Sequence, residues 1–164
     1  MKDITIRDAE KLSAPNPFGL VVSADGNGKP NLMAISWWTY ASNNPATLVI
    51  CISGRGYSHE LISAGGAFTL CLVDESIKEA AFACGTCSGR TVDKAEKFGI
   101  ELEPSALVAP PYVRQSRVAF ECKVTEETAA GDHVLYIAQV VAVHGDESRK
   151  QLYALDGYAR VGTV

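Results

Sequence analysis

The segment from Ser53 to His59, Ser-Gly-Arg-Gly-Tyr-Ser-His, is the first in the chain whose residue types and spacing could do chemistry. It follows an apolar run and precedes a short helical pattern, so we predict a strand-to-helix turn here. Glycines let a backbone approach a ligand closely, and the free N–H groups at a helix start suit a phosphate. Arg55 could add a bidentate contact and Ser58 a hydroxyl donor. The alternative interpretation is an ordinary turn with a solvated arginine.

A second candidate segment runs from Cys84 to Arg90 and contains the pattern C-x-x-C. Two cysteines at this spacing occur in zinc sites and in redox sites, but the chain has no second C-x-x-C and no paired histidine to complete a zinc site. Thioredoxin-type chemistry expects a βαβ context, which the sequence lacks. We therefore expect no metal and interpret the segment as a Gly- and Ser-rich loop that lines a ligand, with a plain connection between two helices as the alternative.

The third candidate is Gly131-Asp132-His133, which stands just before an apolar run. A lone histidine there is usually a surface or structural residue, although it could also meet a cofactor or an electron donor. Trp37, Trp38 and Tyr40 are more often core and interface residues than a platform for a ligand. The sequence has no G-x-G-x-x-G, P-loop or H-E-x-x-H motif, so the usual nucleotide-binding folds are unsupported.

Length and composition limit the proteins to which these segments can belong. The 164 residues suit one domain, 1–164, and 47% hydrophobic with 21% charged residues is the profile of a soluble globular protein. A net charge of -4 without a Lys or Arg run argues against nucleic acid and anionic membranes as partners. No apolar stretch suits a signal peptide or approaches the ~20 residues of a membrane span, so we expect a cytoplasmic protein. Cys51, Cys71 and Cys122 lie in apolar runs, and we expect them to be buried and reduced.

Short β signals dominate the rest of the chain. Asp25-Gly26-Asn27-Gly28 is a strong turn signal, so the runs on either side of it are predicted as a hairpin. The predicted helices are His59 to Ala64 capped by Ser58, Ile77 to Ala83 capped by Ser76, and Lys94 to Phe98 capped by Asp93. The predicted strands are 18–23, 31–38, 47–53, 68–73, 118–124 and 134–143, with a hairpin loop over 126–133.

The last two predicted strands indicate which strand faces must be buried. The apolar residues of 118–124 share one face, and Glu121 and Lys123 lie on the other. In 134–143 both alternating sets are mostly apolar, so both faces must be covered. One face can join a barrel core, whereas the other needs a helix or a second subunit; we predict a homodimer whose contact involves this strand. The alternative to a dimer is that the helix 94–98 and the Pro-rich segment after it cover this second face within one chain.

Six or seven strands with local hairpins and only three short helices predict a mostly β protein, a closed antiparallel barrel rather than the βαβ alternation of a doubly wound sheet. Several segments from about Pro17 to Gly145 follow one another in a distinctive order and spacing: 18–23, 30–37, 41–45, Arg55-x-x-Ser58-His59, Cys87-Ser88-Gly89-Arg90-Thr91-Val92-Asp93-Lys94, 120–124 and 131–133. In these segments the chain resembles the flavin reductase-like family, and most closely its flavoredoxin-type branch. The fold of that family is the FMN-binding split barrel.

This resemblance implies a bound FMN. The flavin ring would lie against the segment 36–42, the phosphate would sit near 53–59, and the loop 88–94 would close over the cofactor. Dimers are the norm in the family, with the cofactor near the subunit interface. The implied cofactor-binding residues are Ser36, Trp37, Trp38, Thr39, Ala41, Ser42, Ser53, Arg55, Ser58, His59, Cys87, Ser88, Gly89, Arg90 and Lys94.

The function that the resemblance implies is an FMN-dependent oxidoreductase, in which NADH or NADPH delivers hydride to the flavin and the flavin reduces flavin or another acceptor. Arg55 and Ser58 would anchor the phosphate, and Lys94 and Arg90 would add positive charge near it. His133 could orient the donor, and no residue is assigned as catalytic acid or base. The first alternative is a non-enzymatic, flavoredoxin-like electron carrier that serves a protein redox partner. The second is a flavin-binding barrel with a regulatory role.

Overall fold

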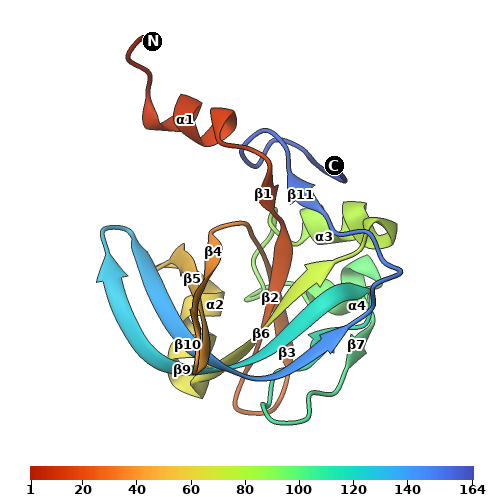
Figure 1. Cartoon of the computed structure of the whole chain (residues 1–164). Helices are drawn as coiled ribbons and strands as arrows, with labels where there is room; N and C mark the ends of the chain where they lie inside the picture. Colours follow the sequence, from red (N-terminus) through yellow and green to blue (C-terminus); the bar gives the residue numbers. More distant parts are fainter.

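A seven-stranded antiparallel sheet forms the centre of the molecule (Figure 1). The structure is a computed structural model that describes every residue, 1–164. The strands of this sheet are β2 Gly19–Ala24, β3 Pro30–Ile35, β4 Trp38–Asn43, β5 Ala46–Ser53, β6 Ala67–Val73, β9 Ser116–Ala130 and β10 His133–Gly145. They lie side by side in the order β3-β2-β6-β9-β10-β5-β4, and each neighbouring pair is antiparallel.

One hydrophobic core lies on the inner face of this sheet. All seven strands contribute side chains to it, from Val21 on β2 to the partly buried Trp38 on the edge strand β4. A sheet whose strands all meet around one core is a barrel, but β3 and β4 do not pair although they follow each other in the chain. The barrel is therefore split between them, and the prediction of a mostly β, split antiparallel barrel is confirmed.

The predicted strand 31–38 is wrong in one respect, because the chain changes edges of the sheet within it. β3 ends at Ile35, whereas β4 begins at Trp38 and pairs with β5 at the opposite edge. Ser36 and Trp37 make the crossing. Residues that favour extended structure continue on both sides of this crossing, so the pattern indicates one strand where the fold has two.

The predicted loop 126–133 is also shorter than expected. β9 continues to Ala130 and β10 starts at His133, so only Gly131 and Asp132 form the turn. Gly131 has a φ of 63°, which glycine adopts without steric cost. The hairpin tip projects away from the barrel core (Figure 1), and its last residues on β9 are exposed. The end of β9 is exposed and carries Thr and Glu residues, so its sequence looks like that of a loop.

Helix α2 (Tyr57–Gly65) packs against β2 and β3, and its Ile62 belongs to the barrel core. It begins earlier than predicted, because the cap is Gly56 and not Ser58. Ser58 lies inside the first turn and is buried. The left-handed residue that ends the helix is Gly66, which has a φ of 65°.

The remaining helices differ from prediction mainly at their starts. Asp74, not Ser76, caps the 3₁₀ turn η1 (Glu75–Ile77), which leads into α3 (Lys78–Ala83). The start of α4 (Lys94–Phe98) is as predicted, because the Asp93 side chain accepts a hydrogen bond from a backbone N–H of the first turn. Helix α1 (Ile6–Leu12) was not predicted; it stands away from the barrel near the C-terminal segment (Figure 1). None of these helices has the length and apolar character needed to span a membrane.

A second core lies on the outer face of the sheet. It gathers side chains from β2, β3 and β6 together with side chains from α3, α4 and the C-terminal segment. A small three-stranded sheet and a two-stranded one flank it. Their strands are β1 Asn16–Pro17, β11 Tyr153–Ala154 and β12 Val161–Gly162, and β7 Leu102–Glu103 with β8 Tyr112–Val113.

The outer face of β5 and β10 lies outside this second core. Leu135 pairs with Cys51, and Ile137 pairs with Val49, so these four side chains share one face; all are half-buried. We call these four residues the bare strip. The helices pack elsewhere, with α3 against β12 and α4 against β3. Helix α4 therefore does not cover the bare strip, although the sequence left that alternative open.

Strand β9 carries a buried carboxylate where the alternating pattern predicts an exposed one. Lys123 is exposed, but Glu121 has no exposed surface. The loop between β7 and β8 lies over it, and the backbone N–H groups of Ala106 and Leu107 donate to its two oxygens at 2.8 and 2.7 Å. His144 Nε2 lies 2.7 Å from Glu121 Oε1. Burial alone would raise the pKa of Glu121, but these hydrogen bonds together lower it below its ordinary value.

Candidate functional site

A cavity of about 480 Å³ opens between the start of α2 and the loop that follows α3. Cavities of this size hold small-molecule ligands and cofactors. It brings together seven of the residues predicted from the sequence, which come from segments far apart in the chain: Arg55, Ser58, Cys87, Ser88, Gly89, Arg90 and Lys94. The other lining residues are Asn31, Met33, Ala34, Gly56, Tyr57, Cys84, Gly85 and Thr86.

The start of α2 places backbone N–H groups without a side-chain cap at the wall of this cavity. The first backbone N–H groups of a helix have no intrahelical partner, and no side chain caps those of α2. Arg55 is exposed just before the helix and forms no ion pair, although its charge lowers the pKa of the nearby Asp132 alongside the stronger effect of His133. The helix start and Arg55, which forms no ion pair, therefore present positive charge at the wall of the cavity.

Arg90 also lines the cavity, but its charge is already partly used. Its guanidinium forms an ion pair with Glu60 on α2 and lies over the Tyr57 ring, 5.3 Å from the centroid. These contacts fasten the middle of the loop to α2. Arg90 thus contributes less free charge to the cavity than Arg55 does.

Lys94 has a structural task in addition to its place in the cavity wall. Its side chain is buried, and Nζ donates to the carbonyl oxygens of Leu32 at 2.8 Å and Cys84 at 2.7 Å. Burial lowers the pKa of Lys94 from its ordinary value. These two hydrogen bonds tie the start of the loop to β3.

Asn31 is a site residue that the sequence prediction missed. It is buried in the cavity wall, where Nδ2 donates to Ser58 Oγ at 2.9 Å and Oδ1 has no hydrogen-bond partner. Gly89 lies directly against it, because a Cβ added at Gly89 would be 1.8 Å from Asn31 Oδ1. A single asparagine within an apolar strand was the available signal.

The two cysteines of the loop differ in their surroundings. Cys84 is fully buried, and burial raises the pKa of its thiol to about 12, so it is protonated at neutral pH. Cys87 is half-buried, and its Sγ lies 3.9 Å from the carbonyl oxygen of Ala83. All five cysteines are free; Cys71 and Cys122 are buried as predicted, whereas Cys51 is only half-buried. No group of three or more His, Cys, Asp or Glu side chains is placed to hold a metal ion.

Trp37 and His133 form an aromatic pair at a neighbouring site. Their ring centroids are 5.0 Å apart, and His133 Nδ1 lies 2.7 Å from Asp132 Oδ1. That hydrogen bond holds the pKa of Asp132 below its ordinary value. Trp37 and Ser36 line a different cavity, of about 470 Å³, which lies beneath α1 and includes Tyr158.

The remaining predicted residues lie outside the 480 Å³ cavity. Trp38, Thr39, Ala41 and Ser42 belong to β4. Ser53 ends β5, and its hydroxyl accepts from the Arg55 backbone N–H at 3.3 Å. His59 is on α2, but its Nδ1 lies 2.6 Å from the hydroxyl of Tyr136, whose side chain is in the barrel core. The structure thus gives His59 a contact within the protein.

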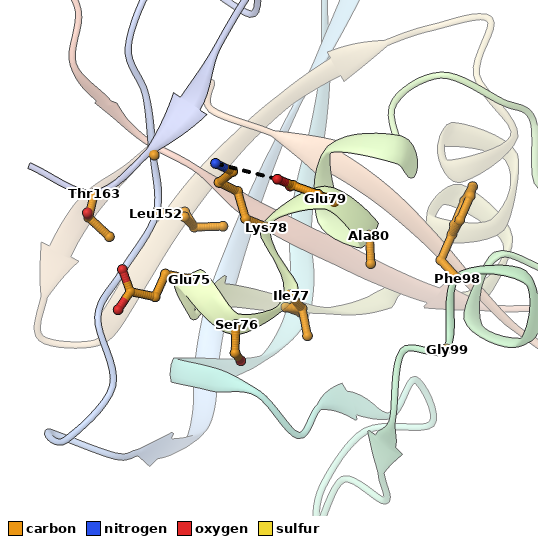
Figure 2. A pocket seen from close by; sticks show the side chains of 11 residues that line it. Glu75, Ser76, Ile77, Lys78, Glu79, Ala80, Phe98, Gly99, Leu152 and Thr163 are labelled. Carbon is orange, nitrogen blue, oxygen red and sulfur yellow. Dashed lines mark ion pairs between the residues drawn. The ribbon is translucent and has the colours of Figure 1, made fainter.

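A larger cavity, of about 780 Å³, contains none of the predicted site residues (Figure 2). It lies among η1, α3, the end of α4 and the C-terminal segment. Its charged side chains are of both signs, and two of them, Lys78 and Glu79, form an ion pair at 3.5 Å. It lacks the combination of helix start, unpaired arginine and unpartnered amide that marks the smaller cavity.

The smaller cavity fits a phosphorylated ligand with further polar groups. Arg55 and the start of α2 suit a phosphate, and the unpaired Asn31 oxygen requires a hydrogen-bond donor. Gly89 packs directly against that oxygen, where a Cβ would collide with it. The protein is thus a split barrel with a candidate anion site at the start of α2.

Comparison with known proteins gives the family. Residues 12–162 match the flavin reductase like domain, and the chain belongs to the flavin reductase-like family. It is 33% identical over 131 residues to an uncharacterized protein of Archaeoglobus fulgidus, covering 79% of this chain and 74% of that one. It is 31% identical over 124 residues to the NADH-dependent flavin reductase StyB of Pseudomonas fluorescens, covering 74% and 68%. Flavoredoxin of Desulfovibrio vulgaris (Miyazaki F) has the same fold, with a TM-score of 0.84, 24% identity and coverage of 100% and 93%.

Proposed function

We propose that this protein binds FMN and works as an oxidoreductase of the flavin reductase type, taking electrons from NADH or NADPH and passing them to flavin or another acceptor. The observation that carries the proposal is the unpaired Arg55 beside the uncapped start of α2. Both lie at a cavity that the segment from Cys84 to Arg90 also lines. The similarity to an NADH-dependent flavin reductase supports the nicotinamide donor. The proposal takes residues 1–164 as one flavin-binding domain.

Each part of the site has a task in this proposal. Arg55 and the first N–H groups of α2 hold the phosphate. The loop from Cys87 to Arg90 covers the ligand and excludes water, with Lys94 fixing the start of that loop. The segment 36–42, which begins at the crossing between β3 and β4, lies against the ring. Bound flavin supplies the redox chemistry, because it can accept a hydride and release electrons singly or in pairs.

His133 is the residue we assign to the electron donor. Its Nδ1 is engaged by Asp132, which fixes the ring and leaves Nε2 free to hold a proton or to bind a polar group of the donor. Trp37 packs against the same ring and gives a flat apolar surface beside it. The two residues together orient a planar ring at the mouth of the site.

A homodimer completes the proposal. The bare strip on β5 and β10 is apolar and not covered by the helices of the chain. A twofold axis would set this strip against its own copy and remove it from water. No nucleic acid or membrane partner is part of the proposed function.

The test is spectroscopic and kinetic. We expect the purified protein to carry FMN, or to take it up when offered, and to consume NADH or NADPH steadily with free flavin as acceptor. Bound FMN without steady turnover would instead favour the second candidate, a flavoredoxin-like electron carrier for a protein partner, which the shared fold supports. A colourless protein that leaves FMN fluorescence unchanged in a titration would contradict both functions.

Arg55→Ala is expected to weaken FMN binding while leaving riboflavin binding nearly unchanged. The lost charge-assisted contact is worth about 1.5–3 kcal/mol, so FMN affinity should fall by about 10- to 100-fold. Riboflavin has no phosphate and loses nothing at this contact. Fluorescence titration with both ligands measures the difference.

Arg114→Ala is the matched control, because Arg114 is exposed and pairs with Glu101 and Glu103 away from the cavity. It should leave both affinities as they are. Equal losses for FMN and riboflavin in Arg55→Ala would mean that Arg55 acts on the fold and not on the phosphate.

A further inference from the structure

The thiols of Cys84 and Cys87 have no task in the proposed function. Both residues line the 480 Å³ cavity, and both thiols are free. Two residues separate them, which is the spacing of redox-active dithiols in other folds. The spacing alone does not decide, since this chain lacks the βαβ context of those folds, so the surroundings of the two sulfurs carry the argument.

The chain keeps winding after α3 ends, and this brings the two cysteines to one side. The backbone N–H of Thr86 donates to the carbonyl oxygen of Ala83, three residues earlier, at 3.0 Å. In a turn of this 3₁₀ type, residues three apart lie above one another with Cα atoms about 6 Å apart. Cys87 Sγ lies 3.9 Å from the same oxygen, which belongs to the peptide bond preceding Cys84. Disulfides join Cα atoms roughly 4.4–6.8 Å apart, so this pair has the spacing to form one.

The two thiols differ in the way that a reactive pair requires. Cys87 is half-buried, so a dissolved molecule can reach its sulfur. Cys84 has no exposed surface, and burial raises the pKa of its thiol to about 12 against the opposing effect of the Lys94 charge. A negative charge on Cys87 raises that pKa further, so the two sulfurs are close enough to interact. One thiol is accessible, and the other is shielded from everything but its neighbour.

Lys94 places a positive charge beside both sulfurs. Burial lowers the pKa of Lys94, whereas a thiolate on Cys84 or Cys87 would raise it. The same attraction stabilises the thiolate, which is the nucleophilic form of cysteine. Nζ also donates to the Cys84 carbonyl oxygen at 2.7 Å, so the charge is held in place next to the pair.

We propose that Cys84 and Cys87 form a redox-active dithiol that reduces a disulfide, with Cys87 as the attacking thiol and Cys84 as the resolving thiol. The Cys87 thiolate attacks one sulfur of the substrate, whose S–S bond breaks and releases one thiol. Cys84 then attacks Cys87 Sγ and releases the second thiol, which leaves an intrachain disulfide. Two electrons and two protons pass from the protein to the substrate. This inference goes beyond the proposed function, because none of these steps involves flavin.

The test uses oxidised glutathione as the substrate disulfide. The protein as purified is reduced, freed of reductant and then exposed to this probe. Residues 79–90 form one tryptic peptide that holds both cysteines, because cleavage follows Lys78 and Arg90. We expect mass spectrometry to find this peptide lighter by two hydrogen atoms and without bound glutathione. Treatment with dithiothreitol should restore its original mass.

Three variants separate the two roles. Cys84→Ala should stop the reaction after the first step, so that Cys87 keeps one bound glutathione. Cys87→Ser should leave Cys84 unmodified, because the Cys84 thiol is buried. Cys51→Ser is the matched control, since it removes another half-buried cysteine and should leave the bridge unchanged. Circular dichroism shows whether each variant is folded; if Cys84→Ala is not, Cys87→Ser and the wild-type peptide decide.

Two results would overturn the inference. A lasting glutathione adduct on Cys87 of the wild type would mean that Cys84 does not resolve it. A wild type in which neither cysteine changes would mean that the pair is inert. Flavin binding and the consumption of NADH do not enter this measurement, so either result leaves the proposed function standing.

Discussion

Glu121→Ala is expected to lower the free energy of unfolding by about 1.5–3 kcal/mol, because the hydrogen bonds to a buried carboxylate are lost. The N–H groups of Ala106 and Leu107 would lose their acceptors, and His144 would lose its carboxylate. The loop between β7 and β8 is held over β9 by these contacts. Urea denaturation of wild type and variant gives the difference directly.

Glu126→Ala is the matched control, since Glu126 is exposed on the same strand. It should change the free energy of unfolding by no more than about 0.5 kcal/mol. Glu121→Gln keeps one acceptor oxygen and should lose less stability than Glu121→Ala. A small effect in both Glu121 variants would mean that the loop does not depend on this carboxylate.

The same carboxylate makes stability depend on pH. The pKa of Glu121 is lower in the folded protein than its ordinary value, so the unfolded chain binds the proton first as the pH falls. Its contribution is fully present above the unfolded pKa, about 4.3, and is lost as the pH falls through the folded value. Wild type should therefore lose stability in acid more steeply than Glu121→Gln, and equal slopes would contradict the assignment.

Ile137→Asp is expected to produce a folded monomer from a dimeric wild type. The substitution places a carboxylate in the middle of the bare strip, where association would have to remove it from water without a partner. The dissociation constant should rise by about a hundredfold or more, since each 1.4 kcal/mol is a factor of ten. Light scattering over a range of protein concentrations measures the oligomeric state.

Val140→Asp tests the opposite face of the same strand. Val140 packs against the barrel core, so a carboxylate there should unfold the chain instead of separating subunits. Strict alternation along the strand would put Val141 on the same face as Ile137. A bulge between Val140 and Ala142 breaks that alternation, so Val141 is not used as a second probe of the bare strip. A wild type that stays monomeric at high concentration would remove the dimer from the proposed function.

The barrel could be predicted from the sequence because most strands are short apolar runs bounded by turn residues. Turn chemistry at Gly28 and the cap at Asp93 are local, so the sequence shows them directly. The split at Ser36 and Trp37 is not local, since it depends on which strand each run pairs with. The burial of Glu121 depends on a loop that returns over β9 from earlier in the chain, and no alternating pattern contains that information.

The candidate site divides in the same way. Arg55 and the loop around Gly89 are marked by glycine-rich sequence, and the fold does bring them to one cavity. Asn31 was missed because its significance lies in an oxygen without a partner, which only the packed structure reveals. His59 is a cofactor-binding residue only by the family resemblance, and the fold gives its Nδ1 a neighbour in Tyr136.

The loop over the cavity is fastened at two points: by the buried ammonium of Lys94 at its start and by the ion pair of Arg90 with Glu60 at its middle. The Lys94 hydrogen bonds join residues at the two ends of the loop and so fix its base, whereas its middle is held by an exposed ion pair. A loop that is already ordered in the free protein does not have to be ordered when a ligand binds, so less conformational entropy is lost on binding.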